Sequence, residues 1–443
     1  MKSIKLNIIK FISKIFIPAI SVAQLFFVFN TNVFSQTYSW YRIPNSPFSF
    51  PGFSDVCFIN ENTGWITTYN GILFRTNNAG ANWTKLDSIF IGDFYGVQFI
   101  NENTGFVCSF NSAYVLLKTT NGGLDLFKVD LPNPAPQGIE SIHALNENFI
   151  YGCGRSDGYP NFIKSSDGGN NWQTKDMSQY ANTLDDIHFI NENTGIISGG
   201  IGSQPEYRGS IILQTTDGGN NWSVKYLGGR NRETGKRICF VNNSTGFVSL
   251  ERIVYQERYF IKTTDGGSTW IQILLPFPGM ITQGIGFINS TTGWIGGDME
   301  NTIGTTDGGL TWFNSNIGTN VHRFQMFGDT LGFAASQYIY KYGISTGISF
   351  LNSETPVNFR LHQNYPNPFN PVTKIKFDVF KTSNVSIKVF DNLGKETAVL
   401  LNQKHLPGSY EIEFDGSKLG SGIYFYQLEA DNFQDVKKMI LIR

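Results

Sequence analysis

The stretch TTDGGNNW, residues 215–222, decides the fold, because near copies of it recur along the chain. The close copies are SSDGGNNW (165–172), TTDGGSTW (263–270) and TTDGGLTW (305–312), and the weaker ones are TNNAGANW (76–83) and TTNGGLDL (119–126). The third residues of the six copies run from 78 to 307 in five steps, about 46 residues each. A period of about 40–50 residues is typical of four-stranded β-propeller blades.

A second motif alternates with the first and occurs seven times. Its copies are FINENTGW (58–65), FINENTGF (99–106), LNEN (145–148), FINENTGI (189–196), FVNNSTGF (240–247), FINSTTGW (287–294) and MFGDTLGF (326–333). The unequal numbers are explained if segment 38–43 is the outer strand of the last blade, with Trp40 in the place of the motif tryptophan. We therefore expect an all-β chain with a seven-bladed β-propeller over residues 37–345, in which strand 38–43 pairs with strand 337–342.

The first motif contains the residues that tight turns require. Glycine adopts positive φ at no steric cost, an aspartate carboxylate accepts backbone N–H groups within a turn, and a tryptophan covers the hairpin. A structural role of this kind is predicted for Asp167, Asp217, Asp265, Asp307, Trp172, Trp222, Trp270 and Trp312.

These turns resemble the Asp-box, or BNR repeat, whose pattern is Ser/Thr-x-Asp-x-Gly-x-x-Trp. Four copies match in full, whereas Asn78 and Asn121 replace the aspartate and Leu126 replaces the tryptophan in the first two copies. Together with FxNxxTGW, the pattern most resembles the photosystem II stability and assembly factor family, over about residues 38–343. The resemblance implies the propeller fold but says little about function.

The N-terminal residues predict export. Four lysines without any acid precede an apolar run at 15–29 and a polar end, which is the order found in a signal peptide. We therefore expect cleavage after Ser35, which removes residues 1–35. The run is too short to span a bilayer, and no transmembrane anchor is expected in the mature protein. The cysteines, at 57, 108, 153 and 239, show no paired spacing and are expected to be small core residues.

The pattern changes after residue 345. A connector over 346–358 is followed, at 359–443, by alternating stretches such as TKIKFDV and GIYFYQLEA, which predict a small Ig-like β-sandwich. The segments NYPNPFNP, DNLGKE and KKMILIR resemble the type A C-terminal sorting domain of type IX secretion. That resemblance implies the type IX machinery as a partner, passage through the periplasm to the outer surface or medium, and removal of the domain. The alternative is an adhesive domain that stays on the protein.

Charge and composition exclude several functions. The net charge is −1, so nothing global attracts nucleic acid or an anionic membrane. No glycine-rich segment has the strand–helix setting of a phosphate loop, and no cofactor is expected.

Two chemical roles, hydrolysis and metal binding, are alternatives to a pure binding role. The segment YRIP (41–44) matches the motif that supplies one catalytic arginine in sialidases, but Arg42 falls on the predicted outer strand, and no pair of facing carboxylates stands out. We therefore expect no enzyme, with a sialidase-like or glucan hydrolase-like protein as the alternative. His143, His188 and Cys239 precede the second motif in consecutive blades, but they lack a metal-site spacing, and no metal is expected.

Loops over the third to fifth blades suggest a binding face. They collect arginine and tyrosine, which are effective interface anchors and binders of carboxylate or phosphate. The candidates are Arg155, Tyr159, Tyr207, Arg208, Arg230, Arg232, Arg252, Tyr255 and Arg258. The sequence thus predicts a secreted scaffold that binds a protein or an acidic glycan, unless nearby acids, including Glu206, Glu233 and Glu251, merely neutralise a solvated surface.

Overall fold

A computed structural model describes residues 38–443 except 44, 51, 87–91, 112, 155–158, 203, 254–256, 278–280, 299–300, 345–347, 353–355 and 406. The predicted signal peptide at 1–35 therefore lies outside the described residues. The chain is all-β, and one 3₁₀ helix, η1 (Pro205–Tyr207), interrupts the strands of the described part. Within that part no helix is both long and apolar enough to cross a membrane.

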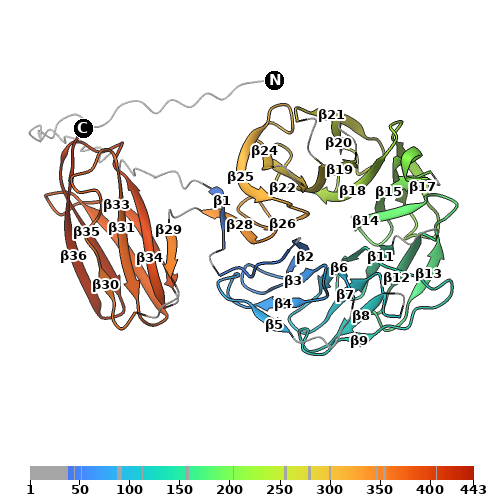
Figure 1. Ribbon diagram of the computed structural model, residues 1–443, viewed down its shortest axis with the longest axis horizontal. Coiled ribbons are helices and arrows are strands. Elements are labelled where there is room, and N and C mark those ends of the chain that lie inside the picture. The colour runs from blue at the N-terminus through green and yellow to red at the C-terminus, as the bar shows by residue number, and fades with distance from the viewer. Residues whose placement is uncertain are drawn as a thin grey trace, which may run out of the picture. The chain divides into compact units, whose positions relative to one another are not determined.

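Residues 53–319 form six antiparallel sheets, each made of four consecutive strands among the described residues (Figure 1). The strands are β2 (Phe53–Phe58), β3 (Gly64–Thr68), β4 (Leu73–Thr76) and β5 (Thr84–Leu86); β6 (Phe94–Phe99), β7 (Gly105–Ser109), β8 (Leu116–Thr119) and β9 (Phe127–Lys128); β10 (Ser141–Ala144), β11 (Ile150–Gly154), β12 (Asn161–Ser165) and β13 (Gln173–Asp176); β14 (Thr183–Phe189), β15 (Gly195–Ile201), β16 (Gly209–Thr215) and β17 (Ser223–Leu227); β18 (Glu233–Phe240), β19 (Gly246–Arg252), β20 (Arg258–Thr263) and β21 (Ile271–Leu275); β22 (Ile281–Phe287), β23 (Gly293–Asp298), β24 (Asn301–Thr305) and β25 (Phe313–Thr319).

A further sheet joins the two ends of this region. Its order is β1-β28-β27-β26, with β26 (Arg323–Phe327), β27 (Leu331–Ala335), β28 (Ile339–Ile344) and β1 (Tyr38–Arg42). Strand β1 pairs antiparallel with β28, and Trp40 lies opposite Tyr342. The N-terminal strand therefore occupies the outer position expected from the sequence, although its partner residues are 340–344 rather than 337–342.

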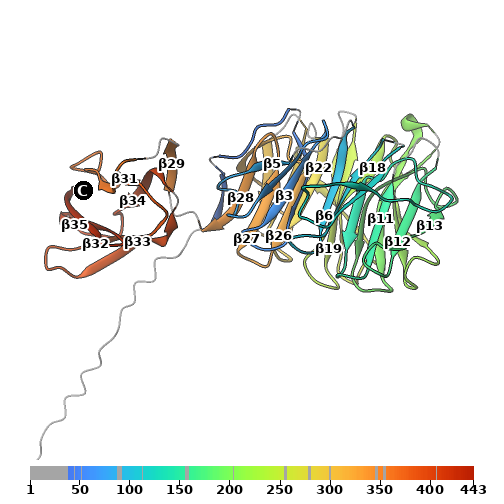
Figure 2. The ribbon, with the colours of Figure 1, turned by 90° about the horizontal axis from the view of Figure 1, so that it is seen from below.

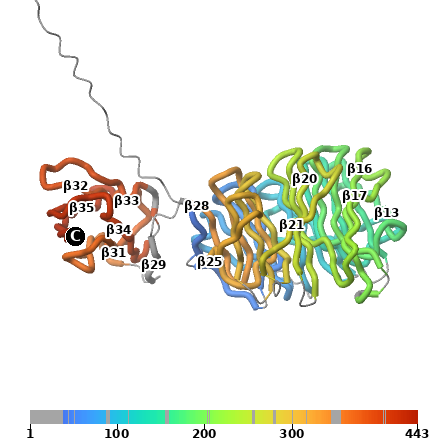
Figure 3. Tube along the Cα trace, turned by 90° about the horizontal axis from the view of Figure 1, so that it is seen from above, coloured from blue at the N-terminus to red at the C-terminus, as the bar shows by residue number. Residues whose placement is uncertain are grey.

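The sheets follow one another in space as they do in sequence. The first strand of each sheet contacts the first strand of the next, from β2 through β6, β10, β14, β18 and β22 to β26, and β26 contacts β2. Figure 1 shows these sheets arranged around a common centre, and Figure 2 shows the same strands side by side from below. In Figure 3 strands β16 and β17 lie beside β20 and β21 of the next sheet.

The second motif stacks aromatic rings between neighbouring sheets. Phe58 lies flat on Phe333, Trp65 on Phe99, Tyr151 on Phe189 and Phe247 on Phe287, with ring centroids 3.5–3.7 Å apart. The motif glycine makes room for the ring of its own sheet, because a Cβ on Gly64 would lie 2.5 Å from the ring of Phe58. The spacing of phenylalanine, glycine and the final aromatic residue is therefore a packing requirement.

The first motif forms the turn between the third and fourth strands. In the fourth of these sheets, Asp217 Oδ1 accepts the N–H of Asn221 at 2.8 Å, and Gly219 N–H donates to Thr215 Oγ1 at 2.9 Å. These hydrogen bonds lower the pKa of Asp217, and the equivalent bonds, led by that from the Asn171 backbone, lower the pKa of Asp167 to about 2. Trp222 Nε1 then donates to Gly219 O at 3.2 Å, so the motif residues satisfy one another.

The C-terminal residues form two further four-stranded sheets around one hydrophobic core. One has the order β29 (Ile348–Asn352), β34 (Gly408–Asp415), β31 (Val372–Val379) and β30 (Arg360–Leu361), and the other β33 (Glu396–His405), β32 (Ser383–Phe390), β35 (Gly422–Ala430) and β36 (Phe433–Leu441). Strand β29 falls inside the predicted connector 346–358. It pairs with β34, whose edge would otherwise be open.

The four cysteines are free thiols. Cys57, Cys108 and Cys153 are buried in three different clusters of apolar side chains, and Cys239 is partly buried.

Candidate binding site

The polar centre of the sheet array is built from two positions in, or directly before, each first strand, counted back from the phenylalanine position of the second motif. Three residues before it stand Asp55, Gly96, Ser141, Asp186, Arg237, Gly284 and Arg323, and four residues before it stand Ser54, Tyr95, Glu140, Asp185, Lys236, Gln283 and His322. In several of the sheets the pairing with the second strand shifts register at these positions. Such bulges re-aim side chains and bring charged groups of different sheets together.

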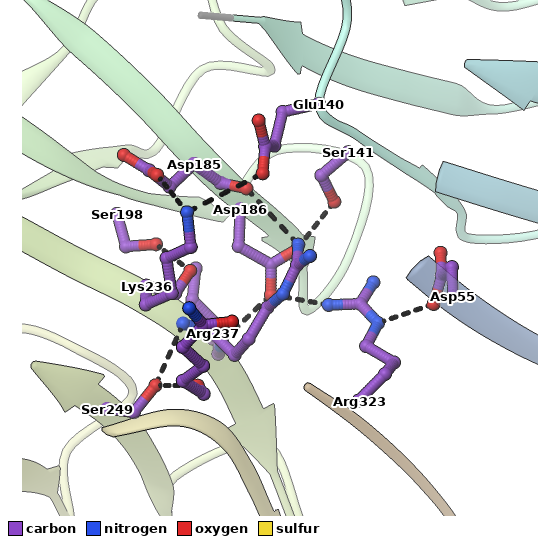
Figure 4. A network of polar contacts seen from close by, with 12 residues as sticks. Asp55, Glu140, Ser141, Asp185, Asp186, Ser198, Lys236, Arg237, Ser249 and Arg323 are labelled. Carbon is purple, nitrogen blue, oxygen red and sulfur yellow. Dashed lines mark hydrogen bonds and ion pairs between the residues drawn. The ribbon is translucent and has the colours of Figure 1, made fainter. Parts of the chain in front are cut away.

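Four of these residues, Asp55, Asp186, Arg237 and Arg323, form the central cluster (Figure 4). Arg323 Nε donates to Asp55 Oδ1 at 2.8 Å, and its Nη1 donates to Asp186 Oδ2 at 3.0 Å. Arg237 Nη1 lies 3.8 Å from Asp186 Oδ1. Arg323, on β26, is therefore bonded to side chains of β2 and β14, so this one residue connects three different sheets.

The same carboxylates also hold backbone groups of the following sheet. Val97 N–H donates to Asp55 Oδ2 at 3.0 Å, and Ile238 N–H donates to Asp186 Oδ2 at 2.8 Å. Burial acts to raise the pKa of Asp186, but Arg323 and Arg237 outweigh it and hold that pKa below its ordinary value. The charges of two carboxylates and two guanidinium groups cancel, so the central cluster is electrically neutral and connects neighbouring sheets.

Lys236 has a different balance of charge. Its Nζ lies 2.8 Å from Asp185 Oδ1, 3.6 Å from Glu140 Oε1 and 3.8 Å from Glu251 Oε2. Burial disfavours the ammonium, but the three carboxylates outweigh burial and raise the pKa of Lys236. We call these four residues the lysine cluster; it contains three carboxylates for one cation.

The residues directly before the motif phenylalanine act as hydrogen-bond acceptors. The backbone N–H of the next sheet's motif phenylalanine donates to Cys57 Sγ at 3.2 Å, to His143 Nδ1 at 3.2 Å, to Cys239 Sγ at 3.3 Å and to Gln325 Oε1 at 2.6 Å. Burial lowers the pKa of His143 to about 3 and that of His188 to about 4, so both rings are neutral. These bonds give His143 and Cys239 a structural role. The described residues contain no group of three or more His, Cys, Asp or Glu placed to hold a metal ion.

A pocket of about 490 Å³ opens beside the lysine cluster. Asp185, Thr234, Lys236 and Gln283 line it from first strands, and Glu251 lines it from β19. Glu206, Arg208, Arg232 and Ile253 line it from the segments between strands. The side chain of Asp185 is 1% exposed and that of Lys236 10%, whereas Arg232 and Glu206 are exposed. We call this the charged pocket, with a buried floor and an exposed rim.

The predicted arginines divide between this pocket and internal contacts. Arg208 and Arg232 line the pocket. Arg230 Nε donates to Glu233 Oε2 at 2.6 Å, and its guanidinium lies over the ring of Tyr259. Arg252 and Arg258 are buried.

The remaining candidates do not line the pocket. Tyr159 and Tyr207 are exposed outside it. Arg155 and Tyr255 lie outside the described residues.

The sequence interpretation missed the floor of the pocket. Asp185, Lys236 and Gln283 are all found four residues before the motif phenylalanine, so aligning the repeats at that position would have shown a run of charged and polar residues in neighbouring blades. From the sequence, Glu251 is expected only to neutralise surface charge. Its contact with Lys236 depends on the folding of β19 beside β18 and has no local signal.

Arg42 lies where the sequence placed it. It belongs to β1, and its guanidinium lies over the ring of Tyr338, with Cζ 3.4 Å from the centroid.

Comparisons with known proteins agree with this architecture. Residues 363–442 match the family described as "Secretion system C-terminal sorting domain", which indicates export to the cell surface or beyond. A solved structure of YCF48 bound to D1 peptide has a TM-score of 0.52 and 17% identity, covering 69% of this chain and 96% of its own. YCF48 from Cyanidioschyzon merolae has a TM-score of 0.52 and 16% identity, covering 69% and 98%. No curated protein matches the chain. The chain thus combines a β-propeller that resembles YCF48 in fold with a secretion sorting domain.

Proposed function

We propose that this protein is an exported, non-catalytic binding protein, whose seven-bladed β-propeller holds an acidic group of a polypeptide ligand in the charged pocket. The observation that carries the proposal is the position of Arg208 and Arg232 on the rim of a pocket of about 490 Å³. Pockets of about 300–1,000 Å³ are typical of sites that enclose a small ligand or the end of a chain.

The blade number rests on strand contacts. Each first strand contacts the next around a complete circuit, and β1 supplies the fourth strand of the last sheet. The proposed mature chain begins after residue 35, the propeller ends at residue 345, and the Ig-like module at 359–443 serves the type IX machinery and is removed.

A polypeptide is favoured over an acidic glycan for two reasons. The similar structure of YCF48 is described as bound to a peptide. The pocket rim also includes Ile253, which is 67% exposed and offers an apolar contact beside the charges. Guanidinium groups bind carboxylates through paired, charge-assisted hydrogen bonds.

The test compares arrays of peptides with free carboxyl termini and arrays of sialylated and sulfated glycans, followed by calorimetry on each peptide that binds. Replacing Arg208 and Arg232 together by Gln keeps both stems and removes both charges. We expect affinity to fall at least about tenfold, roughly 1.4 kcal/mol, and wild-type affinity to fall as salt rises.

The matched control is Lys85→Gln, which removes an exposed charge on β5 from a residue that does not line the pocket. Unchanged affinity in the double variant would move the site elsewhere. Binding to glycans alone would overturn the polypeptide assignment.

One observation favours a hydrolase as the second candidate. Glu140, Asp185 and Glu251 converge, although each faces Lys236. Measurable turnover of a sialoside or β-glucan that is lost in Glu251→Gln would overturn the non-catalytic proposal.

A further inference from the structure

The lysine cluster carries an excess of buried negative charge. The side chains of Glu140, Asp185 and Glu251 are 4%, 1% and 15% exposed, and among the described residues Lys236 forms an ion pair with each of them. Gln283 Nε2 donates to Glu251 Oε1 at 2.9 Å and to Asp298 Oδ2 at 3.1 Å, and Asp298 is itself paired with His322 Nε2 at 2.7 Å. Buried carboxylates are costly unless they are fully paired.

The two arginines of the central cluster are bonded to other carboxylates. Arg323 is bonded to the carboxylates of Asp55 and Asp186, and Arg237 adds a contact to Asp186. Arg237 reaches Asp185 only at its backbone oxygen, 3.4 Å away. Oδ2 of Asp185 is buried and has no hydrogen-bond partner among the described residues. Among the described residues, the cluster therefore has a carboxylate oxygen without a hydrogen bond on the residue, Asp185, that lines the pocket.

A metal ion does not fit the arrangement. The three carboxylates point at the Lys236 ammonium rather than at a common empty point, and the described residues hold no cluster of ligands suited to a metal ion. An organic cation needs no such convergence, since one ammonium can donate to one or two oxygens.

We propose that the floor of the charged pocket binds a primary ammonium group, seated against Glu251 and Gln283 with Asp185 behind them. This inference rests on the proposed function, because the rim arginines hold the acidic end of the same ligand. The ligand is then amphoteric, with its ammonium inward and its carboxylate outward. A peptide N-terminus and a lysine side chain are the two sources of such a group.

The experiment uses the full mature chain and tripeptides without charged side chains, so that the two termini are their only charges. Calorimetry compares the free peptides with N-acetylated peptides, C-terminally amidated peptides and N-acetylated peptides that contain one lysine. We expect acetylation to weaken binding at least about tenfold. Recovery with the lysine peptides identifies the side chain as the source, and its absence identifies the N-terminus.

The outcomes separate this inference from the proposed function. If acetylation changes nothing while amidation weakens binding, the ammonium floor is wrong and the acidic rim stands. If no peptide of any set binds, both are wrong.

Two isosteric variants test the location of the ammonium. Glu251→Gln and Glu140→Gln each remove one carboxylate at nearly the same distance from Lys236, but Glu251 lines the pocket and Glu140 does not. We expect Glu251→Gln to weaken binding of the free peptides about tenfold and Glu140→Gln to change it less than about threefold. Equal losses would overturn the seating of the ammonium in the pocket. If Glu251→Gln fails to fold, the acetylation comparison on the wild-type protein still decides.

Discussion

Replacing Arg323 by Met gives the sharpest test of the central cluster. The variant keeps an unbranched, largely apolar stem but removes the guanidinium, so Asp55 and Asp186 lose their closest cation, while Asp186 retains Arg237 at 3.8 Å. Removing one partner of a buried ion pair costs about 3–5 kcal/mol. For a unit of about 300 residues the entropy of unfolding is roughly 0.6 kcal/mol per degree, so a loss of about 4 kcal/mol lowers Tm by ~6 °C.

The stability loss in the same variant is expected to depend on pH in a definite direction. In the wild type the folded pKa of Asp186 is lowered, so its contribution to stability is present above its unfolded value of about 3.9 and is lost as pH falls through the lower folded value. In Arg323→Met the largest contribution that offsets burial is lost and Arg237 is the remaining cation, so the folded pKa of Asp186 rises. A raised pKa destabilises the fold at high pH and not below the unfolded value. The difference in Tm from the wild type is therefore expected to be largest near pH 7–8 and to shrink towards pH 4.

Thermal unfolding followed by calorimetry at several pH values measures both effects. Lys85→Met serves as a control, since its side chain is exposed and its loss should change stability by less than about 0.5 kcal/mol. A Tm within 1–2 °C of the wild type at pH 7.5, or a deficit that grows on acidification, would refute the role given to Arg323.

Three further outcomes are expected. Deleting residues 38–43 removes β1 and exposes the edge of β28, so size-exclusion chromatography with light scattering should show self-association; a monomer with unchanged Tm would contradict the closure. Intact-mass analysis of protein from the medium should show a chain that lacks most of residues 359–443, and a chain ending at Arg443 would favour the adhesive-domain alternative. His143→Leu removes the acceptor for Phe189 N–H and should lower stability by about 1–3 kcal/mol, whereas zinc should leave the wild-type Tm unchanged; a zinc-dependent rise would restore the metal alternative.

Most of the propeller strands could be predicted from the repeat spacing, because each motif residue forms contacts within its own turn or hairpin. Asp217 satisfies the turn that follows it, and Phe58 and Gly64 must fit one another within a single hairpin. Strand β29 was missed because its pairing with β34 depends on residues about 60 positions away, and the composition of 346–358 is that of a connector.

The binding face was harder to predict because exposure and pairing are properties of the folded chain. The sequence offers no means of distinguishing Arg208, Arg230 and Arg258 as binding candidates. In the structure Arg208 lines the pocket, Arg230 is bonded to Glu233, and Arg258 is buried. The lysine cluster draws residues from positions 140, 185, 236 and 251, so its charge excess appears only when neighbouring sheets are assembled.

The composite last sheet has a consequence for the passage of this chain across membranes. Strand β1 can find its partner only after β28 has emerged, about 300 residues later, and contacts of such long sequence separation form slowly. Until then the unfinished molecule presents open strand edges, a state in which chains of this size are prone to aggregate. The exporting cell must therefore keep the whole segment from β1 to β28 protected as one unit, since no shorter portion of it can complete the fold.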